Sequence, residues 1–407
     1  MKAFFNSDSR ALLNCTRVIA CLTILYLGAV IFFNIRHLSV TGWPIGELMI
    51  NYQGGFVRRG LYGQLLLSLG MGSPLWLAAL MQKIIISVLI LCIGYSVFIW
   101  RSLGLTIIFA LSLALSPGAL LDMAAGGGFE YLDRKELIFY LGLFSIYFIV
   151  ANQTTLNASR LFLISFICSL MVLTHEIFYL VFCPPLFALL LFNAKTIDHV
   201  KFRTVGGLVV IPISLIFLLT LFFAGDGKTA AAITASLNGT DAQGAQGGIL
   251  AIAWKLQDTI NFSKKMYTEG SILFWVFHYL IGLGFNAVFC FLLMGRTKYD
   301  KVLCFSFIWI YTAIIICACL GWDWGRWISI ANIGTALMFA VVYAYQSNQE
   351  PRKPCSPLTA KHQFILLPFI SLLCILSLYT RTPHCCAQGL DQLIFSEQSF
   401  KRIFLYK

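Results

Sequence analysis

The chain has 407 residues, of which 59% are hydrophobic and only 11% are charged. Soluble domains carry about 25% charged residues, so this composition excludes a soluble, a disordered and a disulfide-scaffold protein. The net charge is +12, but no run of Lys and Arg in the sequence is longer than two residues. This pattern indicates basic residues that anchor helix ends at a membrane rather than a nucleic-acid partner. We therefore expect an all-α, polytopic integral membrane protein.

Apolar runs long enough to cross a membrane recur along the chain. They predict about eleven transmembrane helices, within a range of about ten to twelve, in a single transmembrane domain covering residues 1–407. Between 160 and 194, Thr174-His175-Glu176 interrupts the apolar run, which predicts two short helices meeting at a polar break. The predicted spans are 14–34, 75–100, 103–121, 137–152, 160–174, 177–194, 205–224, 270–294, 303–320, 328–346 and 363–380.

The distribution of Lys and Arg predicts a cytoplasmic N-terminus, because the connectors on that side are then short and basic. The C-terminal tail, 381–407, would lie outside although it carries basic residues, among them Lys401, Arg402 and Lys407. In this topology the polar clusters all fall on the outer face, where we expect the chemistry. The clusters are Glu47–Gly63, Asp122–Glu136, His175-Glu176, 225–269 and Trp322–Trp327.

The first of these clusters follows the first span and combines an acid, glycines and two arginines. Glu47 is a candidate catalytic base, and Gly54-Gly55 predict a tight turn or a close backbone approach to a ligand. Arg58 and Arg59 can grip a phosphate in bidentate fashion, or they bind lipid headgroups. The run Leu61–Leu69 predicts an amphipathic helix in the interface plane on the outer face.

The second cluster, Gly126–Glu136, places five charges after three glycines at the start of a span. Asp133 fits a helix-capping role, since acids favour a helix N-terminus. Glu130 has no such role, and is a candidate base or a ligand for sugar hydroxyls. Arg134 is a candidate for binding phosphate.

His175 and Glu176 form the third cluster, at the polar break between two apolar helices. Ionisable residues at membrane depth are costly and usually face a cavity or a partner. Both are candidate catalytic residues, with the alternative that each is a satisfied core residue.

The motif Gly321–Trp327 alternates tryptophans with charged residues at the outer end of a span. Trp322 and Trp324 could stack on sugar faces, with Arg326 on a phosphate and Asp323 fixing the arginine. The alternative is an interfacial aromatic belt with an internal salt bridge.

The 225–269 segment is predicted to be an extracytoplasmic loop. Its Gly/Ala/Thr-rich first half has few hydrophobic anchors, which predicts a linker or a lid that orders on substrate. No P-loop, Gly-x-Ser-x-Gly, His-Glu-x-x-His or dinucleotide fingerprint occurs in the sequence. We expect no cofactor, and nothing in the sequence specifically supports a divalent cation or another metal.

A first span followed by an outer segment with an acid, an interfacial helix and arginines resembles the GT-C membrane glycosyltransferases. The whole layout resembles bacterial O-antigen and exopolysaccharide polymerases, and Gly54–Leu61 and Asp323–Trp327 resemble strings in bacterial proteins of this kind. The chain departs from these patterns in having only Glu47 where the first loop is often Asp-rich, and lysines where polymerases carry arginines in a large outer loop.

The resemblance implies a glycosyltransferase or polymerase of the bacterial inner membrane, acting in O-antigen (lipopolysaccharide) or exopolysaccharide biosynthesis. Its partners would be a polyprenyl-(pyro)phosphate-linked saccharide donor, membrane lipids and other polysaccharide-assembly membrane proteins. The alternatives are a flippase or transporter of a lipid-linked saccharide, and a non-catalytic lipid-modifying partner. Ionisable residues gather on one face rather than through the spans, which favours the enzyme.

Overall fold

The computed structural model describes most of the chain, and every structural statement below refers to the described part. The described residues are 10–34, 43–69, 74–100, 102–124, 135–151, 156–197, 199–237, 239–255, 257–258, 260–261, 272–294, 299–320, 324–347 and 360–379.

The structure is 88% helical, and the described residues contain no strand. The first half contains α2 (Arg10–Asn34), α3 (Trp43–Leu48), α4 (Gly60–Ser68), α5 (Pro74–Ser96), η2 (Val97–Ile99), α6 (Leu103–Leu115), α7 (Leu120–Asp122), α9 (Leu137–Ala151), α10 (Ala158–Thr174) and α11 (Ile177–Ile197). The second half contains α12 (His199–Val205), η4 (Gly206–Val210), α13 (Ile211–Phe222), α14 (Gly227–Ala235), α15 (Gly239–Leu250), η5 (Ala251–Ala253), α17 (Ile272–Leu293), α18 (Asp300–Leu320), α19 (Trp324–Ser347) and α20 (Ala360–Tyr379).

The all-α, multi-pass character predicted from composition is confirmed. Seven described helical segments are long and apolar enough to cross a membrane, and four further apolar helices are shorter. The seven are Ala11–Phe33, Leu80–Ile99, Leu103–Asp122, Phe202–Phe222, Trp275–Leu293, Asp300–Cys319 and Trp324–Tyr345, and the four are Leu137–Ala151, Ala158–Thr174, Ile177–Phe192 and Leu366–Leu378. Each of the eleven predicted spans therefore contains an apolar helix, although only seven reach spanning length.

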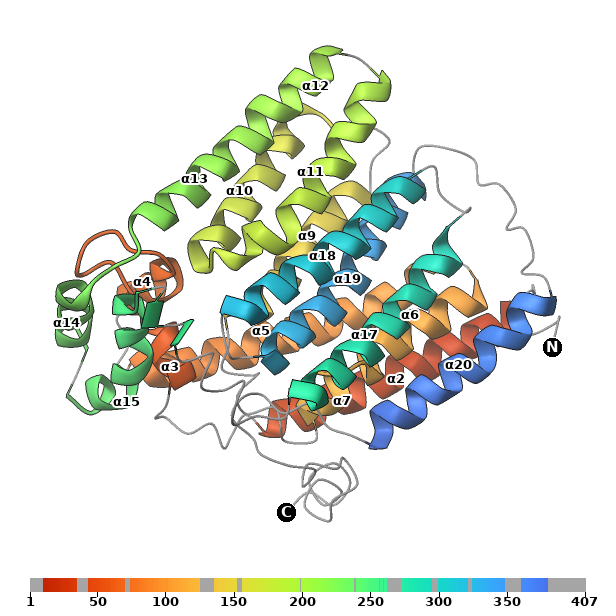
Figure 1. Ribbon diagram of the computed structural model, residues 1–407, viewed down its shortest axis with the longest axis horizontal. Helices are drawn as coiled ribbons and strands as arrows, with labels where there is room; N and C mark the ends of the chain where they lie inside the picture. The colour runs from red at the N-terminus through yellow and green to blue at the C-terminus, as the bar shows by residue number, and fades with distance from the viewer. Residues whose placement is uncertain are drawn as a thin grey trace.

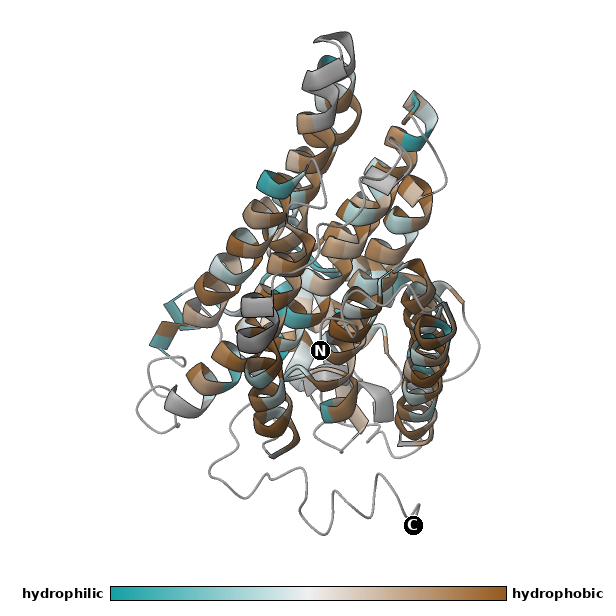
Figure 2. Cartoon of the chain, turned by 90° about the vertical axis from the view of Figure 1, so that its right-hand side faces the viewer, coloured by the Kyte–Doolittle hydropathy of each residue, from teal (hydrophilic) through white to brown (hydrophobic). Residues whose placement is uncertain are grey.

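The helices form a bundle in which α19 is central and packs against α9, α17, α18 and α6 (Figure 1). Nearly all described side chains of α19 are buried, whereas α2, α13 and α18 expose large hydrophobic side chains such as Ile19, Phe222 and Ile308. Apolar colouring covers the helices over most of their length (Figure 2). Exposed apolar surface on this scale is typical of contact with lipid.

A polar network inside the bundle fixes α19 to its neighbours. After α6 the chain turns at Pro117 and Gly118, where helix geometry leaves carbonyl groups without partners. Asn332 Nδ2 donates to the carbonyl of Pro117 at 2.8 Å, and Ser329 Oγ donates to that of Gly118 at 2.7 Å. At the same asparagine, α17 approaches α19 so closely that a Cβ on Gly282 would clash with the Asn332 side chain. These contacts hold α19 in one position.

Helix α13 lies at the edge of the bundle and packs mainly against α10 (Figure 1). It continues from α12 through a π-helical turn, Gly206–Val210. Only Ile213 and Thr220 of its side chains are buried. Its last residues lead directly into the candidate site, because the backbone N–H of Arg58 donates to the carbonyl of Phe223 at 2.8 Å.

The Gly/Ala-rich segment after Phe223, expected to be a linker or a lid, instead forms α14 and α15 beside α3 and α4 (Figure 1). Buried isoleucines such as Ile233 and Ile249 anchor it together with small residues. Ala230 and Ala245 are fully buried, and a Cβ on Gly46 of α3 would clash with the backbone of Ala245 in α15. Small residues therefore allow α3 and α15 to pack closely here, as they do between membrane helices.

Candidate functional site

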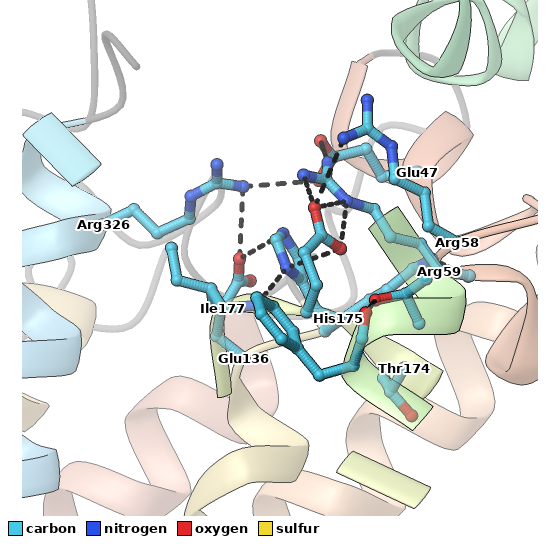
Figure 3. Close-up of polar contacts among 12 residues, drawn as sticks. Glu47, Arg58, Arg59, Glu136, Thr174, His175, Ile177 and Arg326 are labelled. Carbon is cyan, nitrogen blue, oxygen red and sulfur yellow. Dashed lines mark hydrogen bonds and ion pairs between the residues drawn. The ribbon is translucent and has the colours of Figure 1, made fainter. Parts of the chain in front are cut away.

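Ionisable side chains from segments far apart in the sequence meet at one end of the bundle (Figure 3). They come from α3, from the turn before α4, from the start of α9, from the junction of α10 and α11, and from the first turn of α19. We name this group the charged cluster. Its members are Glu47, Arg58, Arg59, Lys135, Glu136, His175, Glu176 and Arg326.

Arg59 lies at the centre of the charged cluster. Its Nε and Nη2 donate to Glu176 at 3.1 and 2.7 Å, and its Nη1 lies 3.5 Å from Glu47 Oε1. Arg59 is the only described non-glycine residue with a positive φ, at 65°, in the left-handed region that side chains disfavour. The ammonium group of Lys135 binds the Arg59 carbonyl at 2.7 Å and holds this turn. Such backbone strain persists only where its surroundings impose it.

The polar break between α10 and α11 is present, as the sequence predicted. Helix α10 ends at Thr174, His175 takes an extended conformation, and α11 begins at Ile177. His175 Nδ1 lies 3.4 Å from Glu176 Oε2 and accepts a hydrogen bond from the Ile177 N–H at 3.3 Å; since that bond uses the lone pair of Nδ1, we assign the proton of the neutral ring to Nε2. That nitrogen faces Glu136, whose Oε1 is 3.8 Å away.

Arg326 enters the charged cluster from the first turn of α19 and is largely buried. Its Nη1 lies 3.3 Å from Glu47 Oε2 and 3.2 Å from Glu136 Oε1. The guanidinium carbon also lies 4.4 Å from the centre of the Trp327 ring, a cation–π distance. Arg326 thus links Glu47 and Glu136 through the same nitrogen, at the end of its side chain that points into the cluster in Figure 3.

Burial and neighbouring charges shift the titration of several groups in the charged cluster. Burial favours the neutral form of Glu176, but Arg59 outweighs it and holds the pKa of this carboxyl well below its usual range. For His175, burial and then the charge of Arg59 lower the pKa well below 6.5, so the ring is neutral at pH 7. Burial lowers the pKa of Lys135 to about 7. Burial, followed by repulsion from Arg59, also lowers the pKa of Arg58.

The exposed fraction of the side chains decreases from Arg58 at one edge of the charged cluster to His175 at its most buried point. The side chain of Arg58 is 23% exposed and that of Arg59 is 18% exposed, whereas Glu136 is 4% and His175 only 1% exposed. A ligand that approaches from outside would therefore meet Arg58 first and Glu136 and His175 last.

The charged cluster includes six of the candidates that the sequence identified. They are Glu47, Arg58, Arg59, His175, Glu176 and Arg326. Trp324 lies two residues before Arg326, but its ring packs edge-on against Trp275 of α17 at 5.9 Å between centroids. Glu130, Arg134, Trp322 and Asp323 lie outside the described residues.

Two residues of the charged cluster, Lys135 and Glu136, were not selected as site residues from the sequence. Both directly precede an apolar span, where charged residues commonly cap the helix or anchor its end. The sequence signal that would have found them is their position: of the charged residues before this span, Lys135 and Glu136 are the two nearest to it. They are therefore carried into the bundle with α9, and both are almost fully buried.

The expected turn at Gly54-Gly55 is also present. Gly55 has a φ of 99°, and Gly54 packs against the backbone of Thr229 in α14, so its close backbone approach is to the protein itself. The predicted amphipathic run forms α4, which buries Tyr62 and Leu66 and exposes Leu65.

The charged cluster can bind an anion through guanidinium groups and can accept a proton on a carboxylate. Within the described residues no group of three His, Cys, Asp or Glu side chains has metal-binding geometry. Comparison of the chain with protein-family models, with curated proteins and with solved structures finds no match.

Proposed function

We propose that this chain is a membrane glycosyltransferase or polymerase that uses a polyprenyl-(pyro)phosphate-linked saccharide on the extracytoplasmic face of a bacterial inner membrane, in O-antigen or exopolysaccharide assembly. One observation carries the proposal: guanidinium groups and carboxylates from distant segments converge at one end of an apolar helical bundle. A lipid-linked phosphate needs both features, because its tail stays in the bilayer while its headgroup requires cations.

The topology behind this proposal is eleven crossings with the N-terminus in the cytoplasm. Four of these crossings are the shorter helices α9, α10, α11 and α20. Alternating crossings place the end of α2, the start of α9, the end of α10 and the start of α19 on the same side, which fits their meeting in one charged cluster.

The charge balance of the cluster supports an anionic ligand. The guanidinium groups of Arg58, Arg59 and Arg326 match three carboxylates one for one, and Lys135 adds one charge when protonated. The excess of one positive charge fits a headgroup phosphate better than a cation. An approaching phosphate would also favour the protonated form of Lys135.

The structure supports different roles for the arginines. Arg59 and Arg326 are engaged by Glu176 and Glu47 at 2.7 and 3.3 Å, whereas Arg58 is 3.6 Å from Glu176 and its Nε has no hydrogen bond. We therefore assign Arg58 to the phosphate of the donor, and Arg59 and Arg326 to positioning the carboxylates. Stabilising the departing phosphate is the contribution that such a cation makes to glycosyl transfer.

The test follows lipid-linked saccharides in cells that carry or lack the gene. We expect cells without it to have truncated surface glycan and to accumulate the lipid-linked intermediate on the outer leaflet, as detected with a membrane-impermeant label. Accumulation on the inner leaflet alone would indicate a flippase and would refute the transferase.

A further inference from the structure

Glu136 is a buried carboxylate whose hydrogen-bonding capacity is unused. Its side chain is 4% exposed, and neither Oε1 nor Oε2 accepts a hydrogen bond. Among the described residues, the guanidinium that lies within ion-pair distance of it is that of Arg326, with Nη1 3.2 Å from Oε1. The Nε2 of His175, 3.8 Å from the same oxygen, likewise has no hydrogen-bond partner. A buried polar group left in this way is unfavourable, and a bound ligand that supplied the missing hydrogen bond would relieve the cost.

The other two carboxylates of the charged cluster are already occupied. Both oxygens of Glu176 accept from Arg59, at 2.7 to 3.1 Å. Glu47 contacts Arg59 with one oxygen, at 3.5 Å, and Arg326 with the other, at 3.3 Å. A carboxylate without hydrogen bonds has all its lone pairs available to a new donor, so Glu136 fits the role of proton acceptor better than the other two.

We infer that Glu136 and His175 bind one hydroxyl group of a saccharide and that Glu136 accepts its proton. A carboxylate only accepts hydrogen bonds, and Nε2–H only donates, so together they match a group that does both. An oxygen about 2.8 Å from each of two atoms that are 3.8 Å apart satisfies both bonds. His175 would hold the hydroxyl in position, because the Ile177 N–H occupies Nδ1 and leaves the proton on Nε2, the nitrogen nearer Glu136.

This inference rests on the proposed glycosyl transfer, and the step balances within it. The acceptor hydroxyl oxygen forms the new bond to the anomeric carbon, and its proton passes to Glu136. The bond between that carbon and the phosphate oxygen breaks, and the phosphate leaves with the electron pair. The proton site and the leaving-group site are therefore separate. The proton goes to Glu136, beside Arg326, whereas the phosphate leaves toward Arg58 at the exposed edge of the charged cluster.

The experiment uses the purified full-length chain in vesicles, with radiolabelled lipid-linked saccharide extracted from cells that lack the gene. Glu136→Gln keeps the shape of the side chain and removes its basicity. We expect donor binding within about threefold of wild type and a loss of transfer of about a hundredfold or more, the range for general-base catalysis. Membrane abundance and gel-filtration profile report whether the variant folds.

A matched pair of substitutions tests the positioning role of His175. Gln places an N–H near the position of Nε2, whereas Asn places its oxygen near the position of Nδ1. We expect His175→Gln to retain more transfer activity than His175→Asn at equal abundance. If instead they are equally active, the orientation assigned to His175 is wrong.

The outcomes separate this inference from the proposed function. A wild-type chain that transfers, together with a Glu136→Gln variant that transfers equally well, would overturn the role of Glu136 alone. A wild-type chain that binds the saccharide but transfers none would refute the glycosyl transfer and the proton acceptor with it. Loss of donor binding in Glu136→Gln, in a folded protein, would assign the residue to the donor and also overturn the inference.

Discussion

Replacing Arg59 with Gln should destabilise the protein much more than replacing its neighbour Arg58 with Gln. The change removes the two-pronged contact with Glu176 and the contact with Glu47, whose side chains are only 11% and 5% exposed. Both carboxylates would remain buried with one cation fewer.

The structure gives the expected magnitude. Removing one partner of a buried ion pair costs about 3–5 kcal/mol, and although Arg59 is 18% exposed, its partners Glu176 and Glu47 are only 11% and 5% exposed. Removing both partners costs far less, so Arg59→Gln combined with Glu176→Gln should recover most of the loss. Arg58→Gln is the matched control. Arg58 lies 3.6 Å from Glu176 and is 23% exposed, so we expect the free energy of unfolding to fall by about 1 kcal/mol or less.

The backbone at Arg59 offers a second comparison. Because its φ is 65°, Arg59→Gly should be more stable than Arg59→Ala by about 1–2 kcal/mol, the cost of a left-handed conformation for a residue with a Cβ. Both variants lack the guanidinium, so the difference isolates the strain.

The assay is SDS titration in mixed micelles, with tryptophan fluorescence reporting the free energy of unfolding. An Arg59→Gln loss within about 1 kcal/mol of the Arg58→Gln loss would show that the contacts with Glu176 and Glu47 do not hold the fold. Equal stability of Arg59→Gly and Arg59→Ala would contradict the strained turn.

Three further outcomes are expected. Arg58→Gln should keep normal membrane abundance but lower the amount of glycan product about a hundredfold or more. Arg58→Lys should retain only part of the product, because an ammonium lacks the guanidinium fork. Normal product in both variants would remove Arg58 from the site. Burial lowers the pKa of Lys135 from 10.5 to about 7, so between these values the unfolded state binds more protons, and the free energy of unfolding should rise by up to about 1.4 kcal/mol per pH unit. Lys135→Met should lose this slope in SDS titrations at pH 7 and 9, and parallel curves would refute the assignment. A reporter active only in the cytoplasm should be active when fused after Lys298 and silent after Gly244, and the reverse pattern would place the charged cluster inside the cell.

The apolar runs predict the positions of the helices well, because membrane helices satisfy their backbone internally and must be apolar over most of their length. The break at His175-Glu176 was also predictable, since two ionisable residues cannot continue an apolar span without partners. The helices of the 225–250 region were not predictable from hydrophobicity. Their packing depends on close contact between small residues such as Gly46 and Ala245, which a hydropathy pattern does not register.

The candidate site, too, was predictable from the sequence only in part. Residue type and position single out Arg59, Arg326 and Glu176, because charges at a membrane boundary need a reason. Their partners are set by the tertiary fold: Arg59 meets Glu176 across 117 residues of sequence, and Arg326 meets Glu47 across 279. Glu136 escaped selection because a charged residue beside a span has an ordinary explanation, and only its burial without a hydrogen bond distinguishes it.

The hydrogen bond between the backbone of Arg58 and the end of α13 connects the site to the surrounding lipid. Helix α13 exposes much of its surface, with Leu215, Leu219 and Phe222 about half exposed or more, and a π-helical turn precedes it. Arg326, by contrast, stands on α19, which is fixed by its buried network. A change in bilayer thickness that tilts α13 would therefore shift Arg58 relative to Arg326, and acyl-chain length becomes a variable that acts on the geometry of the charged cluster.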